Sequence, residues 1–532
     1  MLTQAWREAT WRDLDQPWDI IVIGGGITGA GIFNMAAQKG LKVVLVEAND
    51  FAFGTSSRSS KLIHGGIRYL RNRQFDVVRE SVKERERMLR ESDRLVEPLS
   101  FIFPAYENNQ HETKKMKLGV IVYDLMVPKW QHRTLGKTKT QKALPALSDE
   151  LLIGGVRYYD ARVDDSQLVI RIIMDGIRFG GSGINYCQVI ELCKSKTGIV
   201  EGVIVEDKTG TMQPTHVELR GKVVINATGP WSDALRNQIK GAPKLRRLRG
   251  SHLVFSLEAI PLNAAVTMLH PRDKRALFAI PWENRIIIGT TDLDHDLSEP
   301  SFQENKDETS ITPAEVDYLI EAVHDSFPDY TVNEEDIIST FSGLRPVINT
   351  NAPTPSQESR AHKIWREDGL VTVAGGKLTI FRVMAADVLN FCARQLPGNP
   401  VFHHHEPCFI HPKPQVRQDL TNPDWRMMAG RLGRDVNQFF QEANPQDLQP
   451  IDPIPELWAE LTWAAKNEAV VHLDDLLLRR VRLGVLFPHG GMDLIDQIRK
   501  RVQAPLGWSD QTWTAEVDRY QQIWRENYHL PG

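Results

Sequence analysis

The chain has 532 residues, too many for one compact core, so we expect two or three domains. Hydrophobic residues at 41% and charged residues at 25% are ordinary for a soluble globular protein and argue against disorder or a membrane-spanning class. The net charge of −4 gives no indication of nucleic-acid binding.

The cysteines and the N-terminus point to a reducing compartment. Cys187, Cys193, Cys392 and Cys408 form no CxxC pair or metal-ligand cluster and are too sparse for a disulfide framework, so we expect no metal site. The N-terminal residues lack the apolar core of a signal peptide, and no stretch is long enough to span a bilayer. We therefore expect a cytoplasmic protein.

The first elements in chain order are a strand, a glycine turn, a helix and a second strand. An apolar run at residues 19–23 ends at Gly24, and a second run at 42–47 ends at Glu47, with a helix-like stretch between them. Residues 24–29, Gly-Gly-Gly-Ile-Thr-Gly, satisfy the GxGxxG pattern directly after the first strand. This arrangement predicts a Rossmann-like dinucleotide site.

The glycines and the acid have separate roles in such a site. Gly24 permits the tight turn, Gly26 lets a pyrophosphate approach the backbone, and Gly29 lets the helix pack closely on the strand. Glu47 can accept hydrogen bonds from ribose hydroxyls and would repel a 2′-phosphate, which argues against NADP. FAD and NAD both remain compatible with the motif.

Two later apolar runs end at glycines and favour FAD. Residues 223–230 read Val-Val-Ile-Asn-Ala-Thr-Gly-Pro, and residues 370–377 read Leu-Val-Thr-Val-Ala-Gly-Gly-Lys. We expect both to be buried strands whose ends face one crevice, as in flavoproteins that contact the cofactor again from the end of the domain. Taken singly, either segment could also be an ordinary turn after a strand.

The whole pattern predicts an α/β fold with a Rossmann-like FAD-binding domain, an inserted antiparallel β substrate domain and a C-terminal all-helical domain. Short β-type segments between about 250 and 350 indicate the substrate domain. From about 415 to 532 the pattern is helical, with 464–486 the clearest amphipathic run. The oxidoreductase region spans residues 17–400, with FAD-binding parts at about 17–105, 160–250 and 350–400.

The segment after the second strand is rich in hydroxyls, glycines and cations. Residues 54–70 read Gly-Thr-Ser-Ser-Arg-Ser-Ser-Lys-Leu-Ile-His-Gly-Gly-Ile-Arg-Tyr-Leu. With this segment the chain closely resembles the FAD-dependent (aerobic) glycerol-3-phosphate dehydrogenase family. The likeness continues in one order through Val-Asp-Asp at 163–165, Asn-Ala-Thr-Gly-Pro-Trp at 226–231, Arg-Gly-Ser-His at 249–252, Ile-Pro-Trp at 280–282, Gly-Thr-Thr-Asp at 289–292, Ser-Gly-Leu-Arg-Pro at 342–346 and Gly-Gly-Lys-Leu-Thr at 375–379.

The C-terminal region resembles the family's helical domain more loosely. The likeness lies in Glu-Ala-Val at 468–470 and Leu-Leu-Leu-Arg-Arg-Val-Arg at 476–482. Two positions depart from the family pattern, because Val481 stands where a threonine is expected and Ala361 where an acid is expected. These departures concern substrate tuning rather than the class of enzyme.

The resemblance implies oxidation of sn-glycerol 3-phosphate to dihydroxyacetone phosphate by hydride transfer to FAD, with electrons passed to a quinone. The alternatives are a glycerol-3-phosphate oxidase that uses oxygen and a related flavin oxidase of amino or 2-hydroxy acids. A flavin-holding membrane scaffold without turnover is the alternative outside the enzymes. The sequence leaves the electron acceptor, the role of the helical domain and the formation of a homodimer open.

The predicted cofactor contacts run from the glycine turn to the last strand. Thr55, Ser56 and Ser59 offer hydroxyls to the phosphates or the isoalloxazine edge, and residues 65–66 let the backbone pass close to the ring. Residues 376–379 would aim backbone amides at the flavin N1 and O2 side, where reduced flavin is negatively charged. The predicted set is Gly24, Gly26, Ile27, Thr28, Gly29, Glu47, Thr55, Ser56, Ser59, Leu62, His64, Gly65, Gly66, Val189, Ala227, Thr228, Gly229, Gly376, Lys377, Leu378 and Thr379.

The predicted catalytic residues are His64, Arg345 and Lys377. An imidazole near the flavin is suited to remove the hydroxyl proton of an alcohol close to neutral pH. A flavin-contacting or packing histidine is the alternative for His64. Because the substrate phosphate needs cations, the predicted substrate contacts are Arg68, Arg345, Arg360 and Lys377, with the hydroxyl of Tyr69.

An apolar stretch with basic flanks predicts a surface that faces a membrane. Residues 118–127 are mostly apolar, and a core helix with solvated lysines is equally compatible with them. Because a quinone is lipid-soluble, we expect peripheral attachment to the cytoplasmic face of the membrane. The flanking cations are Lys114, Lys115, Lys117, Lys129, Arg133, Lys137, Lys139 and Lys142.

Overall fold

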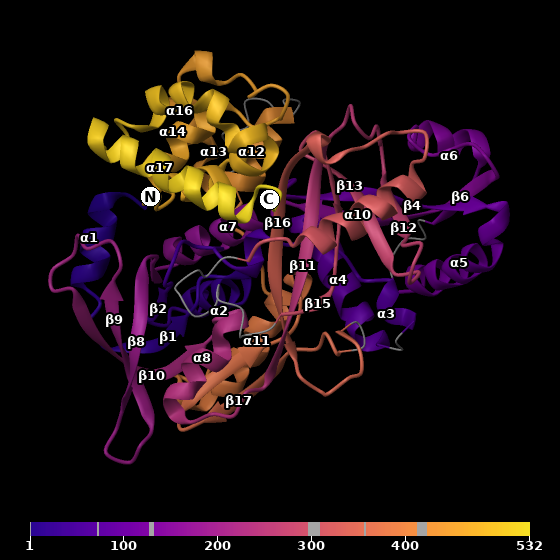
Figure 1. The fold of residues 1–532 in the computed structure, drawn as a ribbon. Coiled ribbons are helices and arrows are strands. Elements are labelled where there is room, and N and C mark those ends of the chain that lie inside the picture. The colour runs from indigo at the N-terminus through magenta and orange to yellow at the C-terminus, as the bar shows by residue number, and fades with distance from the viewer. Residues whose placement is uncertain are drawn as a thin grey trace.

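The computed structural model contains two large sheets and a C-terminal helical domain (Figure 1). It describes residues 2–71, 74–126, 132–295, 309–355, 358–411 and 423–531. In Figure 1 the helical domain lies above the place where the two sheets meet. The α/β class with an added helical domain, predicted from the sequence, is confirmed.

The first sheet is built around parallel strands that are buried on both faces. Strand β1 (Trp18–Ile23) lies between β10 (His216–Asn226) and β2 (Val43–Val46), and Ile23 pairs with both Asn226 and Val46. Continuous burial explains why these strands are apolar runs and not alternating sequences. The other strands of this sheet are β7 (Ser182–Ile184), β8 (Cys187–Lys194), β9 (Val200–Asp207), β17 (Lys363–Glu367) and β18 (Leu370–Ala374).

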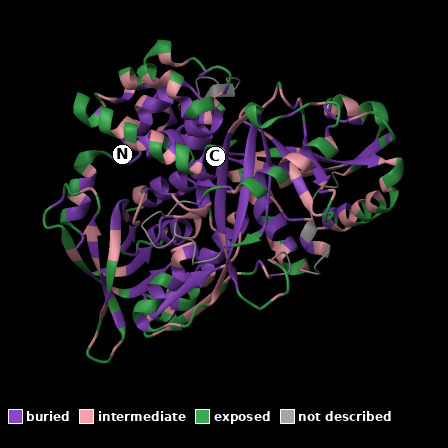
Figure 2. Ribbon diagram, in the orientation of Figure 1, coloured by how far each residue is buried: buried purple, intermediate pink, exposed green. Residues whose placement is uncertain are grey.

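Different elements cover the two faces of the first sheet. On one face, side chains such as Ile20 and Val22 pack with helices α2 (Ile27–Gln38), α7 (Asp165–Arg178) and α11 (Phe381–Cys392). On the other, Ile21 and Ile23 pack with β8, β9, α1 (Gln4–Arg12) and α8 (Ser232–Arg236). This layering leaves the carboxyl ends of β1, β2, β10 and β18 at a shared edge, where α/β proteins place their ligands. In Figure 2 the long central strands are mostly purple, whereas the β8–β9 hairpin is mixed in colour.

The second sheet is mostly antiparallel and includes more of the chain than the sequence analysis assigned to it. Its long strands are β11 (Leu245–Ser256) and β16 (Ile337–Ile348), with β4 (Val96–Tyr106) and β6 (Leu152–Val163). The predicted substrate domain covered only about 250–350, and Pro98 and Pro104 obscured the strand pattern of β4. The remaining strands are β3 (Leu62–Ile63), β5 (Arg133–Gly136), β12 (Ala265–Leu269), β13 (Ala276–Trp282), β14 (Arg285–Gly289) and β15 (Leu293–Asp294).

Helices shield the outer face and the far end of the second sheet. Helix α10 (Pro313–Ser326) begins with a capping box between Thr312 and Glu315 and packs Leu319 and Val323 on the sheet. Figure 1 shows α5 and α6 at the end of the molecule opposite the first sheet. The helices of this region are α3 (Arg68–Arg71), α4 (Phe75–Glu91), α5 (Gln110–Asp124) and α6 (Lys137–Ala143).

The helical domain shares its core with the second sheet. Leu477 and Trp524 of the domain belong to the same buried cluster as Trp282 and Phe341 of the sheet. The amphipathic run predicted for 464–486 is not one helix, because α14 ends at Asn467 and a π-helical segment (Asp475–Arg480) precedes α15. The helices are α12 (Pro423–Leu432), α13 (Val436–Glu442), α14 (Trp458–Asn467), α15 (Leu483–Leu486), α16 (Ile495–Val502) and α17 (Asp510–Asn527).

A left-handed residue and contacts with the start of the chain explain the interruption of that run. Ala469 has φ +55°, which a continuing right-handed helix does not allow. Leu2 N donates to Asn467 O and Ala469 N donates to Leu2 O, so the start of the chain occupies the gap.

Among the described ranges, none of the helices combines the length and apolar character needed to cross a membrane.

Candidate active site

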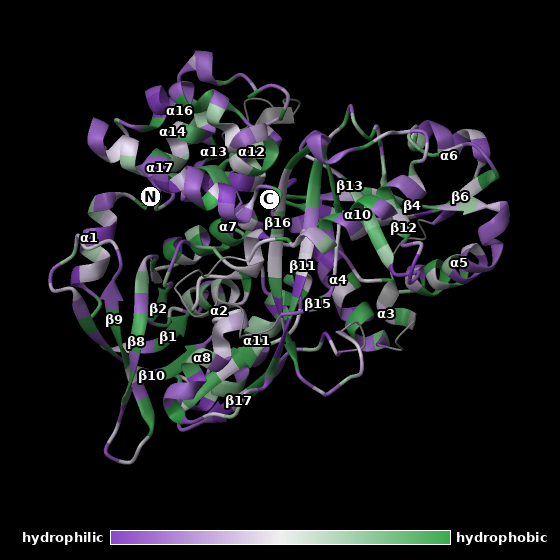
Figure 3. Cartoon of the chain, viewed as in Figure 1, coloured by the Kyte–Doolittle hydropathy of each residue, from purple (hydrophilic) through white to green (hydrophobic). Residues whose placement is uncertain are grey.

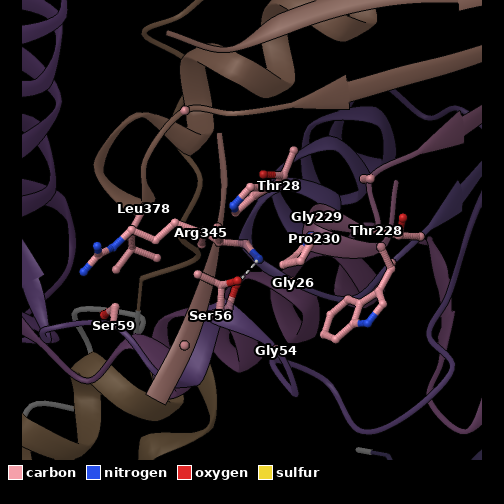
Figure 4. A pocket seen from close by; sticks show the side chains of 18 of the residues that line it. Gly26, Thr28, Gly54, Ser56, Ser59, Thr228, Gly229, Pro230, Arg345 and Leu378 are labelled. Carbon is pink, nitrogen blue, oxygen red and sulfur yellow. Dashed lines mark hydrogen bonds between the residues drawn. The ribbon is translucent and has the colours of Figure 1, made fainter. Parts of the chain in front are cut away.

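A cavity of about 520 Å³ lies between the carboxyl edge of the first sheet and the second sheet. From the first sheet it is lined by residues that follow β1, β2, β10 and β18. The second sheet contributes side chains from β11, β13 and β16. Figure 4 shows Gly26, Ser56, Thr228 and Arg345 around this space. Segments far apart in the sequence therefore build one pocket.

The glycine turn has the geometry of a phosphate cradle. Gly24 has φ +111° and lies so close to β10 that a Cβ there would be 2.6 Å from Ala227 O. A Cβ on Gly29 would overlap the Gly24 carbonyl oxygen, so α2 can start directly behind the strand only with glycine there. A Cβ on Gly26 would meet only Ser56 Oγ, at 3.1 Å. Gly26 thus faces the cavity, and it caps α2 without a side-chain hydrogen bond.

Glu47 and Ser56 brace this turn from two sides. Glu47 accepts from Gly25 N at 2.6 Å and from Asn49 N at 2.8 Å, and burial raises the pKa of its carboxyl. Ile27 N donates to Ser56 Oγ at 2.9 Å, the dashed line in Figure 4. Thr55 donates to Leu344 O of the second sheet. The loop after β2 therefore connects the glycine turn to the opposite wall.

The cavity fits a flavin dinucleotide in its donor set and its shape. A helix N-terminus at Gly26 suits a pyrophosphate, and an acid at Glu47 suits a ribose. The cavity extends from these residues along apolar and hydroxyl side chains to Lys377. Predicted cofactor contacts that line it are Gly24, Gly26, Ile27, Thr28, Glu47, Thr55, Ser56, Ser59, Leu62, His64, Val189, Ala227, Thr228, Gly229, Gly376, Lys377, Leu378 and Thr379.

Three predicted cofactor contacts lie outside the lining, and one more has a different partner. Gly29 packs under the turn, as described above. Gly65 N donates to Tyr123 Oη at 2.9 Å, and a Cβ on Gly66 would overlap the ring of Tyr69. These two glycines admit aromatic side chains, where the sequence analysis expected close passage of the flavin. Ser59 lines the cavity, but its hydroxyl donates to Asp165 at 2.7 Å.

His64, Tyr69 and Lys377 form one wall of the cavity. The backbone N–H and C=O of His64 both contact Thr379 Oγ1, each at 3.3 Å. Lys377 Nζ donates to Gly65 O at 3.4 Å and lies 4.9 Å from the centroid of the Tyr69 ring. The turn after β18 thereby meets the segment directly after β3 that carries His64. The side chain of Arg68 lies outside the described part of the structure.

Arg345 and Arg360 form the cationic wall together with a carboxylate that the sequence analysis assigned no role. Arg345 Nη1 donates to Asp292 Oδ1 at 2.7 Å, and Arg360 Nη2 lies 3.8 Å from the same oxygen. Asp292 is 1% exposed, and Arg275 Nη2 lies 3.3 Å from its other oxygen. Both Arg345 and Arg360 line the cavity. A buried carboxylate thus holds three guanidinium groups that would otherwise repel one another, and two of them line the cavity.

His252 is a second histidine in the cavity that was named only within a motif. Its Nε2 lies 2.8 Å from Ser60 Oγ, and its ring stacks on Phe341. Burial, reinforced by the charges of Arg345 and Lys61, lowers the pKa of His252 well below its ordinary value. A neutral imidazole is therefore expected there near pH 7. In the sequence, only its place at the end of the Arg-Gly-Ser-His motif could have indicated that His252 lies in the cavity.

Comparison with known proteins agrees with this geometry. Residues 19–380 match the family described as FAD dependent oxidoreductase, and residues 402–513 match the family described as the C-terminal domain of alpha-glycerophosphate oxidase. The protein named glycerol-3-phosphate dehydrogenase 2 of Mycobacterium tuberculosis is 33% identical to this chain. The aligned part covers 97% of this chain and 89% of that protein.

The chain belongs to the FAD-dependent glycerol-3-phosphate dehydrogenase family. An aerobic glycerol-3-phosphate dehydrogenase of Staphylococcus haemolyticus is 34% identical over 507 residues, which cover 89% of this chain and 88% of that protein. The solved structure of a family member from Bacillus halodurans in complex with FAD has a TM-score of 0.77 and 25% identity. It covers 99% of this chain and 98% of that one.

Family membership identifies FAD as the cofactor of this protein. The crevice predicted from the glycine-terminated strands is thus a flavin crevice. A structure of L-alpha-glycerophosphate oxidase from Mycoplasma pneumoniae, at 18% identity and a TM-score of 0.56, shares the fold over 73% of this chain. The first family match ends at residue 380 and the second begins at residue 402.

Proposed function

We propose that this protein oxidises sn-glycerol 3-phosphate to dihydroxyacetone phosphate and passes the electrons to a membrane quinone. The observation that carries the proposal is the pairing of Arg345 and Arg360 in a cavity that also holds His64 and Lys377. Relatives named glycerol-3-phosphate dehydrogenase, similar over nearly the whole chain, support the substrate. A phosphate and a secondary alcohol are the two groups that these side chains suit.

The cationic wall would bind the phosphate. Arg345 is 21% exposed and Arg360 is 6% exposed, so both guanidinium groups are partly removed from water. Charge-assisted hydrogen bonds from such groups are about twice as strong as neutral ones. Asp292 would keep both cations oriented before the substrate arrives, which lowers the cost of ordering them.

His64 would act on the hydroxyl of the substrate. An imidazole can accept the hydroxyl proton while the carbon loses its hydride, and bound FAD supplies the hydride acceptor. The contacts between Thr379 and the His64 backbone keep the imidazole on the same wall as Lys377. Lys377, with its charge over the Tyr69 ring, would stabilise negative charge that develops at this end of the cavity.

The decisive experiment is anaerobic reduction of the purified yellow protein. Addition of glycerol 3-phosphate should bleach the flavin absorbance, and an equal concentration of glycerol should bleach it far more slowly. If amino or 2-hydroxy acids bleach it and glycerol 3-phosphate does not, the proposal fails. Reoxidation by a water-soluble quinone that is much faster than reoxidation by air would identify the acceptor as a quinone. The opposite ranking would make the protein an oxidase.

The far end of the second sheet is the proposed membrane contact. Leu118 of helix α5 and Leu125 directly after it are exposed, at 64% and 69%, together with lysines that include Lys114 and Lys117. Hydrophilic residues dominate α6 in Figure 3, where Lys137, Lys139 and Lys142 are exposed. Exposed apolar groups beside cations suit an anionic lipid surface. Val127 and Lys129, part of the predicted stretch, lie outside the described residues.

A charge-reversal variant tests this contact. Each cation near an anionic surface contributes about 1 kcal/mol, so a triple change to Glu at Lys137, Lys139 and Lys142 should strongly reduce sedimentation with anionic liposomes. Flavin reduction by glycerol 3-phosphate should be unaffected. The matched control reverses Lys196, Lys363 and Lys500, which are also exposed but lie on other elements. Equal losses in both triple variants would show non-specific attraction and contradict the proposed surface.

A further inference from the structure

Three arginines of the helical domain are buried against the cofactor-binding loop. Arg479, Arg480 and Arg482 are each 1% exposed, although arginine is rarely buried without a partner. They belong to the Leu-Leu-Leu-Arg-Arg-Val-Arg motif at 476–482, for which the fold alone gives no reason. Some of their partners are in the helical domain itself, because Arg479 donates to Asp474 and Asp475 and Arg480 donates to Glu468 O. The other partners lie more than 300 residues earlier in the chain, between Asp50 and Asp165.

Asp50 is the main partner of this arginine group. Arg480 donates to both of its oxygens, at 2.7 and 2.8 Å, and Arg479 Nε donates at 2.5 Å. Asn185 Nδ2 donates to Asp50 Oδ1 at 3.0 Å. Burial alone would raise the pKa of Asp50, but the charges and hydrogen bonds of Arg480 and Arg479 outweigh it and lower the pKa. Asp50 is therefore a fully buried, fully paired anion.

The loop that Asp50 begins supports the glycine turn from behind. Ala52 N donates to Gly25 O at 3.0 Å, and the ring of Phe51 packs against Gly25. Gly25 in turn donates to Glu47. Phe53 lines the FAD cavity, and the Arg479 guanidinium lies 5.6 Å from the centroid of its ring. Moving Asp50 would therefore move the support of the glycine turn.

Arg482 reaches the next part of the same loop. Its Nη2 donates to Ser57 O at 3.0 Å and lies 3.5 Å from Asp165 Oδ1. Ser57 stands between Ser56, which accepts from Ile27 N, and Arg58, and both neighbours line the cavity. The guanidinium of Arg58 also lies 5.3 Å from the ring centroid of Tyr528, at the end of the helical domain. Residues 50–58 are thus held along their length by C-terminal residues.

We propose that the helical domain is a clamp for the cofactor, in which Arg479, Arg480 and Arg482 hold residues 50–58 against the glycine turn so that FAD is retained. These arginines are positioning residues, because none of them lines the cavity. The clamp acts on FAD and does not depend on which alcohol is oxidised. It gives the C-terminal domain a function that requires no substrate contact.

The experiment measures FAD affinity in full-length variants. Apoprotein of Arg480→Met and of Asp50→Asn is titrated with FAD, and binding is followed by quenching of flavin fluorescence at a temperature where both variants are folded. We expect the FAD dissociation constant to rise by about tenfold or more in each, a typical size for coupling between two sites. The double variant should lose little more than either single variant, because both changes break the same contact.

Arg431→Met is the matched control. Arg431 is also buried in the helical domain and paired with carboxylates, Glu456 at 3.1 Å and Glu460 at 2.5 Å, but it does not contact residues 50–58. It should lower the thermal midpoint while FAD affinity stays within about twofold. If Arg480→Met does not fold, Arg480→Lys replaces it. Unchanged FAD affinity in the folded Arg480 and Asp50 variants, with only lower thermal midpoints, would overturn the clamp.

Discussion

The two walls of the FAD cavity are built in different ways. The cofactor wall uses the backbone of one turn, where Gly24, Gly26 and Gly29 lie within six residues. The proposed substrate wall uses charged side chains from distant positions, with Arg345 and Arg360 joined through Asp292. The glycine turn can form only because its positions carry no side chain. The charged wall can form only because the fold brings the arginines next to Asp292.

The difference explains how each wall responds to mutation. A methyl group at Gly24 or Gly29 meets backbone atoms that cannot move away, so the turn has little tolerance at these two positions. Loss of one arginine leaves the other residues of the charged wall in place, but the negative charge of Asp292 then has one cation fewer beside it. We therefore expect large effects on cofactor binding from small changes in the turn, and graded effects on substrate use from changes in the charged wall.

The largest effect should come from Gly29→Ala. Its Cβ would overlap the Gly24 carbonyl oxygen, so α2 must separate from β1. We expect purified protein with almost no flavin and a lower thermal midpoint.

Gly26→Val should also lose flavin, but the protein should remain folded, because a Cβ there meets only Ser56 Oγ. Wild-type flavin content in a folded Gly26→Val protein would contradict the phosphate cradle.

His64→Ala tests whether the His64 imidazole accepts a proton from the substrate. The variant should retain FAD while the rate of flavin reduction by glycerol 3-phosphate falls by about 10²- to 10⁴-fold, as is typical for loss of a general base. The loss should shrink as pH rises, since the alcohol then needs less help. Anaerobic stopped-flow absorbance measures the rate. The same experiment on His252→Ala serves as a comparison, and a larger loss there would transfer the role to His252.

Arg345→Ala should affect phosphorylated substrate selectively. Loss of a charge-assisted contact costs about 1.5 to 3 kcal/mol, or roughly 10- to 150-fold in kcat/KM for glycerol 3-phosphate. Glycerol, used as a poor substrate, should lose much less. Asp292→Asn should loosen the orientation of both guanidinium groups. It should therefore lower kcat/KM for glycerol 3-phosphate by a smaller factor than Arg345→Ala. If both substrates lose equally, Arg345 does not bind the phosphate.

The smallest expected effect is a pH dependence of the free energy of unfolding, and it comes from Glu468 beside the arginine clamp. Burial raises the pKa of Glu468 to about 7, while its oxygen lies 3.8 Å from Arg480 Nε. The folded protein therefore holds a proton between pH 4.5 and 7 that the unfolded chain releases, so the free energy of unfolding falls as pH rises through this range.

Glu468→Gln should remove that dependence. The amide resembles the protonated acid, so the variant should gain about 1 to 2 kcal/mol relative to the wild type at pH 8 and little at pH 5. Thermal unfolding followed by circular dichroism at the two pH values measures the difference. Parallel pH profiles for the two proteins would show that Glu468 is not protonated in the folded state.

The sequence by itself determined the glycine turn and the strands that lead into the cavity. GxGxxG, the acid at Glu47 and the glycine-terminated strands β10 and β18 are local patterns, and each is set by neighbours in the chain. The family likeness also pointed correctly to FAD and to the fold. Arg345, Arg360 and Lys377 were named as candidate cations because their residue types suit phosphate, and the structure places all three at the cavity.

Only the tertiary structure decided which distant residues act together. Asp292 pairs with arginines 53 and 68 positions away, and Asp50 with arginines more than 400 positions away. It also placed Gly65 against the ring of Tyr123 and Gly66 against the ring of Tyr69, and it put β4 and β6 into the second sheet. A buried charge is stable only beside its partner, and the partner's position depends on the packing of whole layers. No local pattern records that position.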